Sequence, residues 1–332
     1  MKMFPRLIAA CLGAIALNAG AQQFTMRLST VTIDDVNHGY YNALKAGVEK
    51  RSGGRIKVEV YPASQLGPLN RTIEGVQLGT IQMTIGVAGF MVGTDPRFLV
   101  LDVPGLFDDM VHGHKVLRDK ELLKRMKSWG NSKGVESLFL GINGPQVVSS
   151  HKAIRTIADF NGLKLRIPGG TPLHIEPYRK LGISPLNMPP NEGLSAMQNR
   201  VIDGALGAYN FFVSFKYYDL AKPLLELPGS FVTGFGLVNS AFMKSLGPEL
   251  EAIVREESTK AEELYTSRGI KDVEDYKERW TQNKGELIVL SPADQKNYIR
   301  VVSSALPPLF AENPQLKEDY DAMVSTANKY RK

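Results

Sequence analysis

The longest helical pattern in the sequence constrains the fold more than any other feature. Between Glu249 and Gln282, apolar residues recur at helical spacing on one face, and only Gly269 interrupts the pattern. At a rise of 1.5 Å per residue, such a helix reaches about 50 Å, which exceeds the width of one ordinary domain. We therefore predict that this helix lies across two domains. Its apolar face comprises Leu250, Ile253, Val254, Ala261, Leu264, Tyr265, Tyr276 and Trp280.

The first part of the chain alternates strand patterns with helical ones. Residues 24–31, 55–61 and 81–87 have the composition of strands, and residues 38–51 and 69–79 have helical periodicity. This order predicts the start of a parallel sheet that is covered by helices, as in α/β proteins. No glycine pattern of the dinucleotide-binding type follows the first strand. We expect no cofactor.

The middle of the chain contains the strongest turn signal. Residues 112–129 read as one helix and residues 135–142 as a buried strand. The segment Asn143-Gly144-Pro145 follows and is a candidate hinge. Residues 231–239 again have a strand pattern, and we expect this strand to cross back into the first domain.

Two helices, predicted at 292–310 and 314–330, close the chain. We place the ligand cleft between two domains that the long helix bridges. The expected boundaries are residues 22–145 plus 233–270 for domain I, and residues 146–232 plus 271–332 for domain II.

The N-terminus has the pattern of a cleavable signal peptide over residues 1–21. Basic residues precede an apolar stretch at 7–17, and Ala19-Gly20-Ala21 supplies the small residues of a cleavage site before Gln22. The apolar stretch is too short to cross a bilayer. Cys11 ends a short segment that also resembles a lipoprotein box, but simple secretion fits the longer apolar stretch. We therefore expect a periplasmic protein.

The composition of the chain limits the kinds of partner that the protein can have. The chain is 43% hydrophobic and 22% charged, as in an ordinary globular protein. The formal charge of +6 falls to +4 without Lys2 and Arg6 of the leader. Because the basic residues are dispersed, we expect no nucleic-acid partner. The only cysteine lies in the leader, so disulfides cannot stabilise the secreted chain.

One segment, Asp159 to Gly170, predicts the binding chemistry. Apolar residues alternate with Lys164 and Arg166, which is typical of a half-buried strand. Arg166 lies near the strand end, where open α/β sheets bind ligands, and Pro168-Gly169-Gly170 brings backbone amides close. A guanidinium beside free amides suits a carboxylate. The alternative is an ion pair between Arg166 and a neighbouring acid.

With these elements in place, the sequence resembles the DctP-type solute receptors of tripartite ATP-independent periplasmic (TRAP) transporters. The resemblance runs from about Phe24 to the C-terminus. No single motif in it is specific to the family, but the occurrence of all the motifs in this order is. The motifs are Ser52–Pro62, Gln65–Gly67, Glu74–Met83, Val103–Phe107, Asp159–Arg166 and Met197–Gly204.

The resemblance implies a two-domain periplasmic-binding-protein clamshell that closes on one small organic acid and delivers it to TRAP membrane permease subunits. It also implies a long helix that bridges both domains, and an arginine, here Arg166, that pairs with the ligand carboxylate. We expect a monomer without enzymatic activity.

Two departures from the family pattern concern the ligand. Many members have an arginine where this chain has Gln146, which offers an amide but no charge. A glutamate and an asparagine that often follow the Asp-Gly pair are replaced by the segment Ala205–Gly207, and Tyr209 and Asn210 lie close enough in sequence to substitute. With Phe211 nearby, the ligand is expected to be a monocarboxylate, such as an aromatic, branched or keto acid. The alternative is that the phenylalanines of this segment belong to the core.

Three further residues are candidate ligand contacts. Phe90 follows the glycine-rich end of the third strand, a cleft position by topology. His38 opens the first long helix, where we take Asn37 to be the cap. Glu74 lies near the start of the second helix and either faces the cleft or simply stabilises the helix dipole.

Other chemistries have weaker support. His112 and His114 lack accompanying acids or cysteines, so we expect no metal site. Ser149 and Lys152 have a Ser-x-x-Lys spacing in a strand-to-loop context that does not suit catalysis. The alternative classes are a secreted α/β hydrolase, and a receptor that reports ligand occupancy to a membrane sensor. The absence of a nucleophile–base pair argues against the hydrolase.

Overall fold

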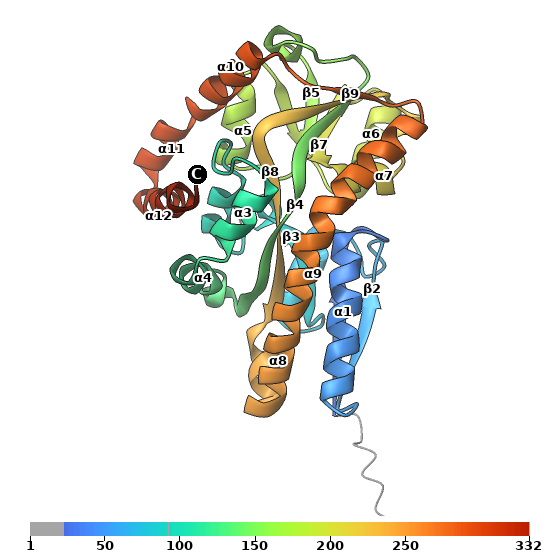
Figure 1. Ribbon diagram of the computed structural model, residues 1–332, viewed down its shortest axis with the longest axis vertical. Helices are drawn as coiled ribbons and strands as arrows, with labels where there is room; N and C mark the ends of the chain where they lie inside the picture. Colours follow the sequence, from blue (N-terminus) through green and yellow to red (C-terminus); the bar gives the residue numbers. More distant parts are fainter. Residues whose placement is uncertain (1–22, 92, 332) are drawn as a thin grey trace, which may run out of the picture.

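A computed structural model describes residues 23–91 and 93–331. The predicted signal peptide therefore lies outside the described residues. The described chain forms two lobes, one above the other in Figure 1, and both contribute to a single mixed sheet. None of the described helices is long and apolar enough to cross a membrane.

The sheet has nine strands in the order β2-β1-β3-β8-β4-β7-β5-β6, and β9 pairs with β8. Two strands, β4 and β8, are 16 and 17 residues long and run through both lobes, so the lobes share one sheet (Figure 1). The strands are β1 (Phe24–Ser29), β2 (Ile56–Tyr61), β3 (Met83–Val87), β4 (Val135–Ser150), β5 (Lys164–Ile167), β6 (Ser184–Asn187), β7 (Gly204–Ala208), β8 (Pro223–Asn239) and β9 (Glu286–Ile288).

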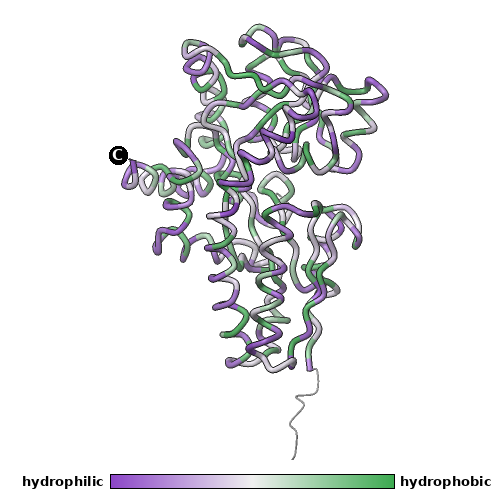
Figure 2. Tube along the Cα trace, turned by 45° about the vertical axis from the view of Figure 1, so that its right-hand side comes forward, coloured by the Kyte–Doolittle hydropathy of each residue, from purple (hydrophilic) through white to green (hydrophobic). Residues whose placement is uncertain are grey.

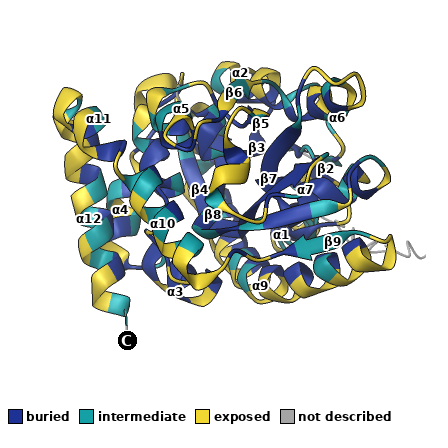
Figure 3. Cartoon of the chain, turned by 90° about the horizontal axis from the view of Figure 1, so that it is seen from above, coloured by how far each residue is buried: buried dark blue, intermediate teal, exposed yellow. Residues whose placement is uncertain are grey.

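Helices surround this sheet and bury its central strands, whereas the outer strands β2, β6 and β9 are partly exposed (Figure 3). The α-helices are α1 (Val36–Arg51), α2 (Leu69–Leu78), α3 (Met110–Leu117), α4 (Lys120–Lys127), α5 (Pro172–Arg179), α6 (Pro190–Gln198), α7 (Tyr209–Ser214), α8 (Ser240–Ser245), α9 (Gly247–Gln282), α10 (Pro292–Ser303), α11 (Leu306–Glu312) and α12 (Pro314–Tyr330). The 3₁₀ helices are η1 (Ala88–Phe90), η2 (Pro96–Asp102), η3 (Asn131–Lys133), η4 (Ile157–Phe160) and η5 (Tyr217–Asp219).

The lower lobe confirms the predicted alternation of strands and helices. Strands β1, β2 and β3 pair in parallel, and α1 and α2 connect them. The N-cap of α1 is Asp35, whose carboxylate accepts a hydrogen bond from the backbone N–H of His38 at 3.0 Å. The prediction that Asn37 caps this helix is therefore wrong, because Asn37 already lies in the first turn.

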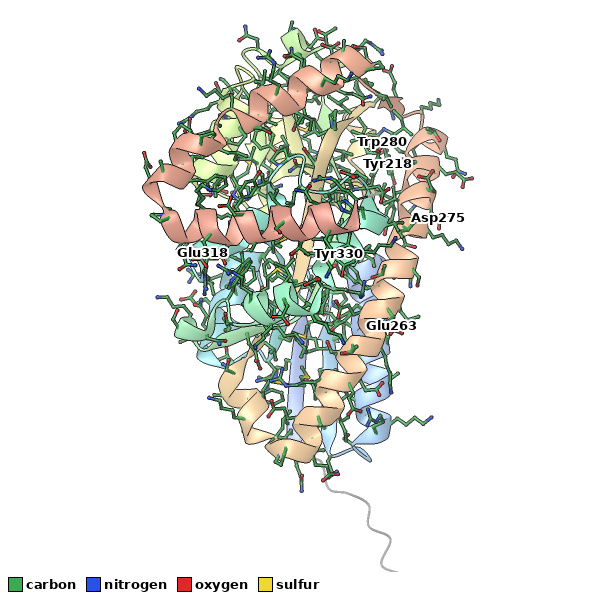
Figure 4. All side chains as sticks on the ribbon, turned by 60° about the vertical axis from the view of Figure 1, so that its left-hand side comes forward. Tyr218, Glu263, Asp275, Trp280, Glu318 and Tyr330 are labelled. Carbon is green, nitrogen blue, oxygen red and sulfur yellow. The ribbon has the colours of Figure 1, made fainter. Side chains whose placement is uncertain are left out.

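The helix α9 has 36 residues and spans both lobes, which confirms the prediction of a bridging helix. It packs against α1 in the lower lobe and against α7 and β9 in the upper lobe. In Figure 4, Glu263 and Asp275 mark the exposed face of α9 at the levels of the two lobes.

The predicted turn at Asn143-Gly144-Pro145 is part of strand β4 and does not interrupt it. Proline has no N–H to donate to the ladder, so a bulge accommodates it. The register against β8 shifts between Ile142 and Gly144, and again between Pro145 and Val147. Where the sequence predicted a break, the structure therefore has a bent but continuous strand.

Two predicted single helices are pairs of helices. The stretch 112–129 divides at Asp119, which caps α4 by accepting hydrogen bonds from the backbone N–H groups of residues 121 and 122. The stretch 292–310 divides because Pro307 and Pro308 suit the first turn of a new helix. The last helix, α12, packs against α3 and η2 (Figure 1).

Each lobe has an apolar core of its own. Met26, Leu28 and Leu44 belong to the core of the lower lobe, and Leu165 and Tyr298 to that of the upper lobe. Figure 2 shows apolar segments within both lobes. A larger cluster packs between them and the helices α3, α4 and α12. The carboxyl ends of β1, β3, β5 and β7 meet where the lobes face each other, which positions the site.

Candidate ligand-binding site

A cavity of about 80 Å³ lies between the lobes at the carboxyl ends of four strands. Open α/β sheets bind ligands at this place. Its walls come from the segments that follow β1, β3, β5 and β7, and from the two crossing strands. The lining residues are Thr30, Val31, Thr32, Asn37, Leu69, Ile85, Gly86, Val87, Phe90, Asn143, Arg166, Pro168, Pro190, Gly207, Ala208, Asn210, Phe211 and Val232.

Arg166 is the one cation among these lining residues, and it is only 2% exposed. Its Nε donates to the carbonyl of Met188 at 3.1 Å, and its Nη1 donates to the carbonyl of Leu206 at 2.9 Å. Its Nη2 is buried and has no hydrogen-bond partner. Two backbone carbonyls therefore fix the orientation of the guanidinium, and one donor nitrogen remains for a ligand.

No carboxylate pairs with Arg166 among the described residues. The alternative, an ion pair between Arg166 and a neighbouring acid, is therefore not formed in this structure. Burial lowers the pKa of Arg166 to about 10, which leaves the guanidinium charged at neutral pH. A buried charge without a counter-ion is costly. An anionic group in the cavity would supply both the counter-charge and an acceptor for Nη2.

An aromatic ring covers this arginine. The ring centre of Phe211 lies 5.5 Å from Arg166 Cζ, close enough for a cation–π contact. A side chain at Gly207 would place its Cβ 2.9 Å from Cδ1 of Phe211. The ring thus occupies the space above residue 207, where a longer side chain would otherwise project.

The polar groups of the cavity are mostly engaged by residues behind its wall. Asn37 and Asn143 both accept a hydrogen bond from the hydroxyl of Tyr265 on α9. Asn210 donates from Nδ2 to Asp35 Oδ2 at 2.7 Å. The prediction missed Thr30, Thr32 and Asn143. The sequence did offer a clue to them, because Thr30 and Thr32 follow the strand β1 and Asn143 lies in the crossing strand β4.

Four of the predicted site residues, Arg166, Asn210, Phe90 and Phe211, line this cavity, and four do not. Gln146 accepts from the hydroxyl of Tyr178 on α5 at 2.6 Å, because β4 turns its side chain to the face that α5 covers. Glu74 lies on the exposed side of α2 and pairs with Arg71 at 2.9 Å.

Tyr209 and His38 are the other two. Tyr209 donates to Glu226 Oε2 at 2.9 Å and lines a separate cavity of about 280 Å³ beside β8, β9 and α9. The Nδ1 atom of His38 accepts from the backbone N–H of Asp34 at 3.2 Å, outside the cavity. In this structure, neither side chain could contact a ligand in the cavity.

Comparison with known proteins decides the family. Residues 29–313 match the bacterial extracellular solute-binding proteins, family 7, named DctP. The chain belongs to this family. A solute-binding protein of Verminephrobacter eiseniae is 32% identical over 231 residues, which make up 68% of each chain. The 2,3-diketo-L-gulonate-binding periplasmic protein YiaO of Escherichia coli is 31% identical over 205 residues, 61% of this chain and 62% of that relative.

The fold of this solute-binding protein is also that of solved TRAP receptors. A TRAP periplasmic solute-binding protein from Haemophilus influenzae, with bound L-gulonate, superposes with a TM-score of 0.86 at 23% identity, covering 93% of this chain and 100% of that one. The comparisons confirm the two-domain receptor fold. Members of the family are extracytoplasmic receptors of transport systems and not enzymes.

The two lobes of the receptor touch beside the cavity at a pair of glycines. A Cβ built on Gly89, in η1, would lie 2.2 Å from the carbonyl oxygen of Pro168, which follows β5. A Cβ on Gly169 would lie 2.4 Å from the carbonyl oxygen of Gly89, and Gly169 has a φ of +98°. The described state is therefore closed at this point, and the contact requires the absence of side chains.

We predict that Gly89→Ala hinders closure and weakens ligand binding by about tenfold or more. Because φ is not positive at this residue, the alanine clashes with Pro168 only when the lobes meet. Isothermal titration calorimetry would measure the affinity, and the matched control is Gly93→Ala, where a Cβ would meet no atom within 4 Å. Equal affinities of the two variants would contradict the role of this contact.

Proposed function

We propose that this receptor binds a short monocarboxylate with an apolar body, such as a branched or keto acid, and delivers it to a TRAP membrane permease. The observation that carries the proposal is the buried Nη2 of Arg166, which has no partner among the described residues. Its role as the carboxylate anchor is part of the proposal.

The charge of the cavity supports a single carboxylate. Arg166 is the only Lys, Arg or His side chain among the lining residues. Gln146, which replaces a second arginine of many relatives, lies outside the cavity and supplies no charge. A second carboxylate of a ligand would therefore be desolvated without a counter-ion, which is unfavourable.

The shape and the lining of the cavity support a small apolar body. Aromatic and aliphatic side chains, including Phe90, Phe211 and Leu69, form most of the wall. The volume of about 80 Å³ is smaller than that of the apolar cavity of about 150 Å³ known to admit benzene. Within the class predicted from the sequence, branched and keto acids of a few carbons therefore fit better than aromatic acids.

The ligands of the two relatives described above share a carboxylate and differ from the proposed ligand in the rest of the molecule. The Escherichia coli relative is named for 2,3-diketo-L-gulonate, and the Haemophilus influenzae structure contains L-gulonate. Both are hydroxyl-rich acids that need many hydrogen-bond partners. In this cavity Asn37 and Asn143 already share the hydroxyl of Tyr265, and Phe211 covers Gly207, so fewer polar groups remain.

We propose that the two domains that close on the ligand are those expected from the sequence, with one change. The expected domains are residues 22–145 plus 233–270 and residues 146–232 plus 271–332. Because α12 packs against α3 and η2, we assign this helix to the first body. Cleavage of the signal peptide, a periplasmic location and a monomeric receptor complete the proposal. A receptor that signals occupancy to a membrane sensor would use the same site, and transport assays with the permease would separate the two.

We predict that Arg166→Met weakens binding of carboxylates by about thirtyfold or more, because a buried charge pair loses one partner. The melting temperature should change little. The variant removes a buried charge that has no counter-ion, but it also leaves the carbonyls of Met188 and Leu206 without these donors. Calorimetric titration with 2-oxobutanoate and a panel of other short acids would measure the affinities.

The matched control is Arg179→Met, which removes an exposed arginine from an ion pair with Glu176 and should change the affinity less than twofold. Unchanged binding by the Arg166→Met variant would contradict the assignment of the anchor.

We also predict that Phe211→Ala shifts the preference of the receptor toward larger acids. Removing the ring opens space beside Arg166 and should weaken binding of the shortest acids by about tenfold while larger acids lose less. Competition titrations with acids of three to eight carbons would show the shift. Phe215→Ala is the control, because its ring packs on Phe211 at 5.1 Å but does not line the cavity. An unchanged order of acids would refute this role of Phe211.

A further inference from the structure

One buried hydrogen bond crosses between the lobes at the edge of the cavity. Asn210 Nδ2 donates to Asp35 Oδ2 at 2.7 Å, although the two residues are 175 positions apart. Asp35 caps α1 in the lower lobe, and Asn210 lies in the first turn of α7, which follows β7 of the upper lobe. Their side chains can meet only when the lobes are together.

The carboxylate of Asp35 is 1% exposed and has neutral donors only. Thr32 Oγ1 and Asn37 Nδ2 donate to Oδ2, and the backbone N–H of His38 donates to Oδ1. These three donors belong to the lower lobe, so they persist when the lobes separate. Asn210 supplies the fourth donor, and among the described residues it is the only one that closure adds.

Other polar groups face this carboxylate from α9. Burial raises the pKa values of Tyr265, Tyr276 and Asp272, and the nearby charge of Asp35 adds to each rise. None of these three adds a positive charge beside Asp35. The neutral amide of Asn210 is thus an important part of its compensation in the closed state, since a hydrogen bond to a charged acceptor in a dry site is strong.

Asp35 is not among the residues that line the cavity, whereas Asn210 is. The carboxylate therefore acts on a ligand only through the position of Asn210 and of the helix that carries it. This distinguishes Asp35 from Arg166, whose free nitrogen is available to the ligand.

We propose that Asp35 and Asn210 form a closure latch, in which Asp35 is a positioning residue that sets the fraction of closed receptor. The proposal rests on the proposed function of the cavity as a site that closes on its ligand. The measured Kd of such a receptor is the intrinsic Kd divided by the fraction that is competent to bind. Loss of the latch therefore raises the Kd of every ligand by one common factor and leaves their order unchanged.

The test uses Asp35→Asn, which preserves the helix cap, since asparagine is as good an N-cap as aspartate. The new amide removes the charged acceptor of the latch. Asn210 can bond to it only by turning its own Oδ1 toward residue 35, and that neutral bond is weaker than the bond to the carboxylate. The matched control is Asp109→Asn at the N-cap of α3, where the carboxylate accepts only from the backbone N–H of His112, at 2.7 Å. The double variant D35N/N210D exchanges donor and acceptor and should restore the bond.

The first readout needs no ligand. Lys50→Cys and Lys180→Cys place one label in each lobe at exposed positions, and the described residues contain no other cysteine. Spin-label distance measurements on the ligand-free receptor should show a closed population in the parent and in Asp109→Asn. That population should fall in Asp35→Asn and recover in D35N/N210D.

The second readout is calorimetric titration with 2-oxobutanoate, 2-hydroxybutanoate and 2-methylpropanoate. We expect Asp35→Asn to raise the Kd of all three by the same factor, about tenfold. The double variant is compared through the ligand-free distances alone, because residue 210 lines the cavity and its new carboxylate would act on the ligand directly. Equal distance distributions for Asp35→Asn and Asp109→Asn would overturn the latch, and so would a factor that differs between the acids. If no acid binds the parent, the proposed function fails, while the ligand-free distances still test the latch.

Discussion

The site depends on one buried guanidinium that the protein itself leaves without a counter-charge. Arg166 stands at the carboxyl end of β5, and the carbonyls of Met188 and Leu206 hold two of its nitrogens. The pairing of β5 with β7 is therefore part of the site, because it brings the Leu206 carbonyl to the arginine. None of the described residues supplies a carboxylate to Arg166, and closure over a ligand carboxylate would supply one.

The shared strands make this closure possible without a separate linker. Strands β4 and β8 and the helix α9 pass from one lobe to the other, so motion between the lobes has to bend these elements. The register shifts around Gly144 and Pro145 place the irregular part of β4 beside the cavity. The contact of Gly89 with Gly169 and the bond between Asp35 and Asn210 then hold the lobes together on the ligand side.

Local patterns predicted much of this arrangement from the sequence. The period of two around Arg166 and the rule for strand ends place this arginine in the cavity, and the length of the helical pattern at 249–282 indicates a bridging helix. The four residues that the structure places elsewhere depend on information that local patterns lack. The bulges in β4 determine on which face of the sheet Gln146 lies. The hydroxyl of Tyr209 donates a hydrogen bond to Glu226 of β8. The partner of Asp35 lies 175 residues away.

The most direct test of the central claim is a thermal-shift comparison of short carboxylic acids with their amides on the purified receptor. The two sets share size and shape and differ in the charge that Arg166 is proposed to bind. At a hundredfold excess over Kd, a ligand stabilises the native state by about 2.7 kcal/mol, which is readily detected. The account predicts that branched or keto monocarboxylates raise the melting temperature and that their amides do not. Equal shifts by acids and amides, or shifts by dicarboxylates alone, would contradict it.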